Sequence, residues 1–224
     1  MTGATTTMTA SPRTGVMDTT DSMLVRRCLE GDLGAYADLV DRYKNPVHRF
    51  VARSVRNATD AEDLTQDVFV QAYASLGRFR SDAAFKTWIF RIAHNRVIDY
   101  SRRQRKRRQV VASAPSSPED EDLSPTEDLP GPARDNPITG LCRDELAARV
   151  QDAVAGLSDK LRLVVILYDF EGHSYEEVAA IAGCPVGTVK SRLFNARSEL
   201  KRKLSSYIAA RLPGETPDDD EGRR

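Results

Sequence analysis

Apolar side chains recur at three- and four-residue spacing along residues 21–108, and this period predicts amphipathic α-helices. Asp21 is placed to cap a short helix that ends at Gly31, and Asp32 is placed to cap the next helix. We expect Pro46 to kink or break that second helix, because proline lacks the backbone donor that a helix interior uses.

The same pattern predicts two further helices before the basic cluster at 102–108. Thr59 and Glu62 have the spacing of a capping box, and Gly77 is placed to end the helix that they begin. The next helix can start at Asp82. Its apolar stripe comprises Phe85, Trp88, Ile89, Ile92, Ala93, Val97 and Tyr100. These helices make a first domain over residues 21–108.

Residues 109–140 differ from the flanking sequence in composition. They hold six prolines and most of the acidic residues that have no basic neighbour. Such a segment buries too little apolar surface to offset the entropy of ordering the chain. We therefore interpret it as a flexible acidic linker between two domains, and the segments 1–20 and 213–224 as disordered tails.

Helical periodicity returns over residues 141–212. A helix is expected from Leu141 to Leu157, and Ser158 is placed to cap another that Gly172 ends. Ser174 and Glu177 then form the spacing of a second capping box.

The last two predicted helices are separated by a tight turn between Gly183 and Pro185. The first is short and rich in alanine, and the second is long and basic. Its buried stripe would be Val189, Leu193, Ala196, Leu200 and Leu204. This arrangement predicts a helix-turn-helix, whose second helix enters the major groove of DNA. The fold class is therefore all-α, with two small helical domains.

Polar and basic side chains occupy the other faces of the final helix. Those off the apolar stripe or flanking it are candidate base and phosphate contacts: Thr188, Lys190, Ser191, Arg192, Phe194, Asn195, Arg197 and Ser198. An exposed Phe194 would suit a thymine methyl group. The alternative is a helical hairpin with a solvated basic face.

The charge distribution supports contact with nucleic acid although the formal net charge is zero. Residues 78–108 have a local charge of +9 and residues 185–212 a local charge of +6, whereas residues 113–140 have a local charge of −6. Two basic surfaces are therefore expected on the folded domains, because most of the compensating acids lie outside them.

The first domain combines two opposite surfaces. The helix beginning at Asp60 has a local charge of −4 over residues 60–76, and the following segment mixes aromatic residues with arginines. Interleaved aromatic and basic groups suit single-stranded nucleic acid, whose bases stack while its phosphates bind cations. The alternative is that Phe85, Trp88 and Tyr100 belong to the core and that the polar face is merely solvated.

At these residues a family resemblance appears. The segments DAEDLTQDVFVQAY and FRSDAAFKTWIFRIAHNRVIDYSRR resemble region two of extracytoplasmic-function sigma factors of bacterial RNA polymerase. The segment LSDKLRLVVILYDFEGHSYEEVAAIAGCPVGTVKSRLFNARSEL resembles region four of the same family. The resemblance covers most of residues 23–207.

The resemblance implies three sets of functional residues. Polymerase contact, on the clamp helices of the largest subunit, would come from Asp63, Leu64, Gln66, Asp67 and Phe69. The melted minus-ten element would contact Phe79, Arg80, Ser81, Asp82, Asn95 and Arg96. Beside this set, our own hypothesis from the basic cluster is that Arg102, Arg103 and Arg105 bind phosphates. The minus-thirty-five element would contact the final helix, where Asn195 replaces a family arginine and favours adenine over guanine.

The resemblance also implies partners: core RNA polymerase, including the flap of its second-largest subunit, promoter DNA and an anti-sigma factor. We expect a cytoplasmic protein with no membrane contact of its own, no metal and no cofactor. Cys28, Cys142 and Cys184 lack the spacing of a zinc site or a disulfide scaffold.

Two other classes of function are weighed against this one. A dimeric helix-turn-helix regulator would have a dimerisation helix with sustained heptads, which does not follow Leu204. An enzyme is disfavoured because the motifs GxSxG, GxxxxGK[ST], HExxH and GxGxxG are absent from the sequence.

Overall fold

The computed structural model describes residues 19–55, 57–79, 84–112 and 137–211. Most of the expected N-terminal tail, the C-terminal tail and the central part of the expected linker lie outside these residues. Every regular element in the described part of the chain is helical, which confirms the all-α fold class.

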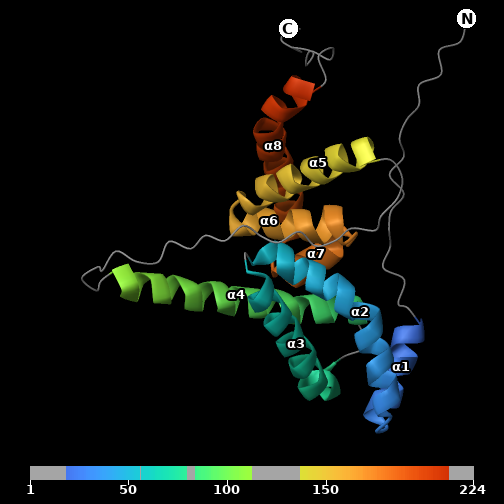
Figure 1. Ribbon diagram of the computed structural model, residues 1–224. Helices are drawn as coiled ribbons and strands as arrows, with labels where there is room; N and C mark the ends of the chain where they lie inside the picture. Colours follow the sequence, from blue (N-terminus) through green and yellow to red (C-terminus); the bar gives the residue numbers. More distant parts are fainter. Residues whose placement is uncertain (1–18, 56, 80–83, 113–136, 212–224) are drawn as a thin grey trace, which may run out of the picture.

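The first domain is built from α1 (Thr19–Leu29), α2 (Leu33–Ser54), α3 (Ala58–Ser75), the short 3₁₀ turn η1 (Leu76–Arg78) and α4 (Phe85–Ala112) (Figure 1). Their apolar stripes meet in a core where Phe50, Val51, Val68 and Ile89 have no solvent exposure. Asp32 caps α2 as expected, since its carboxylate accepts a hydrogen bond from the Ala35 backbone at 3.2 Å.

Local expectations for this domain are corrected at three places. Asp21 lies inside α1 rather than at its cap, and its buried carboxylate accepts hydrogen bonds from Arg42 at 2.6 Å and from the Tyr43 hydroxyl. Of the two outcomes expected at Pro46, a kink or a break, the break does not occur, because α2 runs through this residue. The third helix is capped by Asn57, whose side chain accepts from the Asp60 backbone at 3.2 Å, two residues before the expected Thr59.

The second domain contains α5 (Pro137–Ala155), α6 (Asp159–Val165), the π-helical turn η2 (Ile166–Phe170), α7 (Tyr175–Ala182) and α8 (Val186–Arg211). The capping box at the start of α7 is present in full, with both Ser174–Glu177 hydrogen bonds formed. Helix α4 extends to Ala112 and α5 begins at Pro137, so both helices are longer than the sequence pattern indicates.

The two domains pack against each other. Helix α4 lies along α7 (Figure 1), and the buried apolar residues of both domains form one continuous core. At the centre of the contact Phe90 of α4 meets His173, which precedes α7, with 4.6 Å between ring centroids. Both side chains are buried.

Candidate nucleic-acid interface

Helices α7 and α8 form the predicted helix-turn-helix. Gly183 ends α7 in the left-handed conformation, with φ of 63°, and the Cys184 backbone N–H donates to the Ala179 carbonyl at 3.1 Å. Val178 of α7 and Val189 of α8 are fully buried between the helices. The turn and this packing hold the opposite face of α8 outward.

That outward face contains five of the predicted contact residues. Lys190, Ser191, Asn195 and Ser198 are exposed, and Phe194 has 73% of its surface exposed. Thr188 is half-buried nearby. A hollow of about 390 Å³ lies beside Phe194 and Lys190 and extends toward Tyr175. An exposed phenylalanine among donors can contact a thymine methyl group while its neighbours contact base edges or phosphates.

The two flanking arginines are already held by the protein. Arg192 is half-buried, with its Nη1 3.6 Å from the Cys184 sulfur. Arg197 forms an ion pair with Asp169 of η2 and lies over the Tyr168 ring, 5.5 Å from its centroid. The Asp169 carboxylate raises the pKa of Arg197. These contacts fix both guanidinium groups at the edges of the exposed face.

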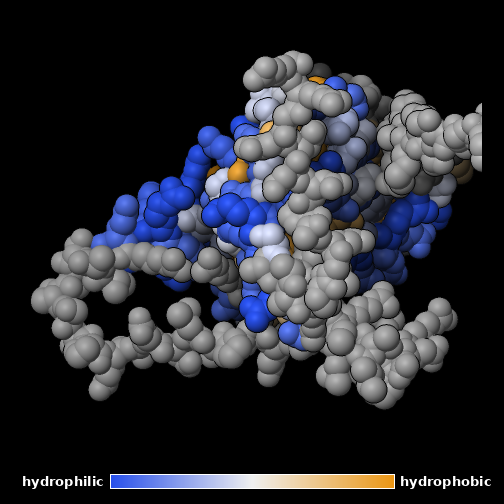
Figure 2. Space-filling model, turned by 90° about the horizontal axis from the view of Figure 1, so that it is seen from above, coloured by the Kyte–Doolittle hydropathy of each residue, from blue (hydrophilic) through white to orange (hydrophobic). Residues whose placement is uncertain are grey.

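A second basic face lies on α4. Asn95, Asp99, Arg102 and Arg103 are exposed on one side of the helix, and Arg105 is also exposed. The outlying end of α4, at the left in both views, is hydrophilic (Figure 2). This part of α4 extends beyond the core and presents cations to solvent.

Two of the predicted minus-ten residues have structural contacts. Arg96 donates from Nη2 to the Gln71 side chain of α3 at 2.7 Å, which ties α4 to α3. Phe79 is half-buried, and its ring centroid lies 5.7 Å from that of Phe85 and 5.2 Å from that of Trp88. The predicted contacts Arg80, Ser81 and Asp82 lie outside the described residues.

The acidic face predicted on α3 is present. Asp63, Gln66 and Asp67 are exposed together, whereas Leu64 has only 6% of its surface exposed and lies in the core, unlike the expected surface contact. Phe69 is half-buried, and its backbone carbonyl accepts a hydrogen bond from the Tyr36 hydroxyl at 2.6 Å.

Sequence reasoning missed the apolar extension of this face. Val70 and Tyr73 are 69% and 50% exposed, one and two turns beyond Asp67. The sequence could have indicated this exposure, because both residues lie off the stripe of Leu64 and Val68, and apolar residues outside the buried stripe of a helix face solvent.

The residues between the domains were also missed. The side chains of Phe90, Glu171 and His173 are nearly or fully buried, and each contacts the other domain. Phe90 follows the buried Ile89 directly, and two consecutive apolar residues widen the apolar face of a helix beyond one stripe. Glu171 and His173 flank Gly172 in a turn, where sequence periodicity offers no signal.

Two kinds of feature are absent from the described residues. No cluster of histidine, cysteine and carboxylate side chains there could hold a metal ion. None of the helices in the same residues combines the length and hydrophobicity needed to span a lipid bilayer.

A helix-turn-helix with an exposed basic helix, packed on a helical domain with its own basic face, defines a two-domain DNA-binding transcription factor. The Sigma-70 region 2 model matches residues 39–107, and the Sigma-70, region 4 model matches residues 147–200. The chain belongs to the extracytoplasmic-function sigma factors, which direct promoter recognition and transcription initiation by RNA polymerase.

Two relatives match the sequence of this chain over nearly their whole lengths. The ECF RNA polymerase sigma-E factor of Escherichia coli K12 is 38% identical over 191 residues, which cover 84% of this chain and 96% of the relative. The RNA polymerase sigma-H factor of Pseudomonas aeruginosa is 36% identical over 189 residues, covering 84% and 95%.

Solved structures have the same architecture. CnrH, in complex with the cytosolic domain of CnrY, matches with a TM-score of 0.61 and 26% identity over 84% of this chain and 98% of that one. The sigma factor RpoE of Bartonella quintana, in complex with the anti-sigma factor NepR, matches with a TM-score of 0.58 and 27% identity over 76% and 96%. The alternative of a dimeric regulator is not favoured.

Proposed function

We propose that this sigma factor binds core RNA polymerase through α3 and contacts promoter DNA through α4 and α8. The main support is the segregation of charge among three exposed faces. The α3 face has two carboxylates, whereas the exposed faces of α4 and α8 are basic. A negative face repels DNA, so it suits a protein partner, while the basic faces attract phosphates.

On α3 the polymerase contact consists of Asp63, Gln66 and Asp67, with Phe69 beside them. The partner is the clamp of the largest subunit. Leu64 acts indirectly, because its burial in the core holds the helix in place. The flap of the second-largest subunit contacts the second domain.

On α4 the melted minus-ten strand lies along the exposed face. Asn95 offers a donor and an acceptor to an unpaired base, and Arg102, Arg103 and Arg105 bind phosphates. The segment from Phe79 through Arg80, Ser81 and Asp82 completes this site. Arg96 positions α4 through its hydrogen bond to Gln71.

On α8 the minus-thirty-five duplex contacts Thr188, Lys190, Ser191, Phe194 and Asn195, with Arg192 and Arg197 on the flanking phosphates. Asn195 selects adenine, because an asparagine amide matches the donor and acceptor of that base.

The protein works in the cytoplasm without catalytic chemistry, metal or cofactor of its own. An anti-sigma factor regulates it. Two relatives of known structure support this proposal, since RpoE was solved with an anti-sigma factor and CnrH with the cytosolic domain of CnrY.

The test is run-off transcription with sigma-free core polymerase on genomic fragments. We expect specific start sites only when the purified chain is added. Sequence-specific duplex binding without polymerase, together with an absence of specific starts, would contradict the proposal and favour an autonomous regulator.

A further inference from the structure

A buried carboxylate joins the two domains. The Glu171 side chain, just after η2, is 3% exposed. Its Oε2 lies 3.2 Å from Arg49 Nη2 and its Oε1 lies 3.3 Å from Arg53 Nη1, and both arginines belong to α2. Lys86 of α4 donates to the Glu171 backbone carbonyl at 3.0 Å. Three cations of the first domain thus converge on one residue of the second.

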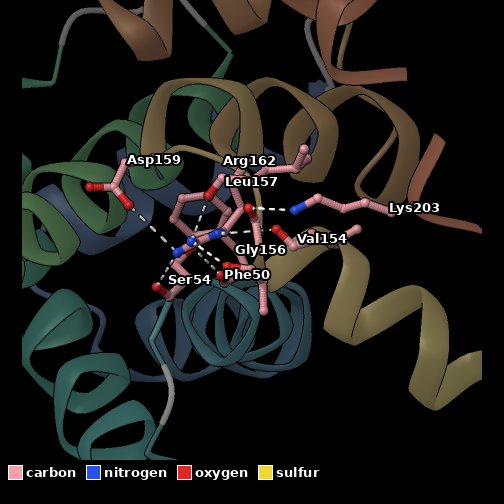
Figure 3. A network of polar contacts seen from close by, with 9 residues as sticks. Phe50, Ser54, Val154, Gly156, Leu157, Asp159, Arg162 and Lys203 are labelled. Atoms are coloured by element: carbon pink, nitrogen blue, oxygen red, sulfur yellow. Dashed lines mark hydrogen bonds and ion pairs between the residues drawn. The ribbon is translucent and has the colours of Figure 1, made fainter. Parts of the chain in front are cut away.

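Further contacts surround this cluster. The Arg53 guanidinium lies over the Phe170 ring, 4.6 Å from its centroid. Next to it Phe90 packs on His173. At another edge Arg162 of α6 directs Nη1 toward the Ser54 carbonyl at the end of α2, 3.5 Å away (Figure 3). An apolar centre with polar contacts around it is the usual anatomy of a specific protein interface.

The backbone after η2 aims these side chains into the first domain. The Glu171 N–H donates to the Ile166 carbonyl at 2.9 Å, which is the wider spacing of a π-helix. Gly172 then adopts a φ of 68°, and the His173 N–H donates to the Leu167 carbonyl at 3.0 Å. Because this turn is internally hydrogen-bonded, Glu171 projects from a defined position.

The stability of the contact between the domains depends on the pairing of the Glu171 carboxylate. A carboxylate removed from water is stable only when it is paired and hydrogen-bonded. Arg49 and Arg53 supply that pairing only while the domains touch. Loss of the negative charge at Glu171 therefore weakens the contact between the domains. Exchange of the charges of Glu171 and Arg53 can restore it.

With the two domains in contact, the distance between α4 and α8 is too short to span both promoter elements. Helix α4 packs on α7 and α7 packs on α8, and each packing step separates helix axes by about 8 to 10 Å. The two DNA-contacting helices thus lie about 20 Å apart at their closest approach. The minus-ten and minus-thirty-five elements are about 25 base pairs apart, which is about 85 Å of B-DNA.

We propose that the ion-paired Glu171 acts as a latch that holds the free protein in a closed form unable to engage both promoter elements. The promoter part of this inference rests on the proposed function, whereas the latch itself does not. Opening separates Glu171 from Arg49 and Arg53, and both sides of the contact become solvated.

The latch is tested on the full chain by small-angle X-ray scattering. The variants are Glu171→Arg, Arg53→Glu, the double exchange, and the milder Glu171→Gln. Asp41→Arg is the matched control, because it makes the same charge change in an exposed pair with Lys44, away from the interface. Far-UV circular dichroism confirms that each variant is helical.

We expect both single reversals to increase the radius of gyration and the maximum dimension, Glu171→Gln to do so partially, and the double exchange to return toward the wild type. Asp41→Arg should scatter like the wild type. Single reversals that scatter like the wild type would overturn the latch, and so would a double exchange that is as expanded as either single variant.

Run-off transcription at limiting protein then tests the promoter consequence. We expect Glu171→Arg to increase the yield several-fold over the wild type and the double exchange to lose that increase. An expanded Glu171→Arg protein with wild-type yield would overturn the inhibitory role. If the wild type and every variant produce no specific starts while scattering shows the expected opening, the latch stands and the proposed function fails.

Discussion

The Phe90 ring on α4 meets the His173 imidazole edge-on, and neither imidazole nitrogen makes a hydrogen bond with any described residue. The nearest carboxylate oxygen, Oε2 of Glu177 on α7, is 3.7 Å from Nδ1. The charges of Lys86 on α4 and Glu171 after η2 also act on the imidazole, the first lowering its pKa and the second raising it. Burial dominates among these influences and lowers the pKa of His173 from its ordinary 6.5.

This position predicts a pH dependence. The folded protein binds fewer protons at His173 than the unfolded chain, so this contribution to stability is full above pH 6.5 and decreases as the pH falls toward the lowered pKa. A tenfold difference in proton affinity between the folded and unfolded states corresponds to about 1.4 kcal/mol. We expect thermal unfolding of His173→Phe to depend less on pH between 7.5 and 5.5 than that of the wild type.

His94 of α4 provides a comparison, because burial lowers its pKa as well. His94→Gln should flatten the profile independently, and the double variant should be flatter than either. Glu177 titrates at lower pH: its pKa is lowered to about 2, first by the neighbouring His173, so its contribution to stability decreases only as the pH falls from about 4.5 toward 2. An unchanged slope in His173→Phe would exclude this histidine as the source.

Arg162 is expected to be a main contributor to stability. Its side chain is 15% exposed and donates to the carbonyls of Ala155 at 2.7 Å, Leu157 at 2.9 Å and Val154 at 3.3 Å (Figure 3). Arg162→Ala leaves these carbonyls without their donor, and we expect the free energy of unfolding to fall by about 2 kcal/mol.

Urea denaturation measures this change, and Arg162→Lys is the matched control. Lysine keeps the charge but lacks the planar fork that reaches several acceptors at once, so it should recover only part of the loss. Equal stability of the lysine variant and the wild type would show that charge alone matters at this position.

Neighbouring residues of α4 should have separable effects on promoter binding. Asn95→Ala should cost about 1 to 3 kcal/mol against one preferred base of a premelted minus-ten element and little against the others. Arg102→Ala should weaken all templates alike and reduce the log-log salt slope by about one unit. Holoenzyme binding to templates that differ at single bases measures both.

Arg96→Ala is the structural comparison for that series. Its guanidinium is bonded to Gln71, so its loss should lower stability by about 1 to 2 kcal/mol and leave base preference unchanged. If Asn95→Ala weakened every template equally, Asn95 would be a phosphate or structural contact rather than a base contact.

The acidic face of α3 should affect polymerase binding alone. Replacing Asp63, Gln66 and Asp67 together by alanine should weaken binding to core polymerase at least tenfold, which is about 1.4 kcal/mol. Helicity and the DNA binding of the second domain should not change. Asp38→Ala, which removes an exposed carboxylate from α2, is the control. Normal binding by the triple variant would place the polymerase contact elsewhere.

Local signals in the sequence were sufficient where the stabilising partner lies within a few residues. The Ser174 and Glu177 capping box, the turn at Gly183 and the Val189 to Leu193 stripe were predicted as the structure has them, because each depends on contacts within one or two helical turns. The helix-turn-helix and its exposed polar face follow from these features.

Local signals were insufficient where distant residues compete with them. Asp21 is a strong capping residue, yet its partners Arg42 and Tyr43 lie on another helix and draw it into the interior. Pro46 lies between Tyr43 and Val47, both buried, so packing on both sides keeps α2 continuous despite the missing hydrogen bond.

The amino-acid sequence by itself therefore determined the helical fold class, the helix-turn-helix, the two basic faces and the family, since periodicity, capping and charge are local or compositional properties. Tertiary structure alone decided that Glu171 meets Arg49 and Arg53, more than a hundred residues away in sequence, and that His173 packs on Phe90. Such pairings depend on how whole helices pack, because Glu171 and His173 meet these side chains of the first domain only after both domains have folded.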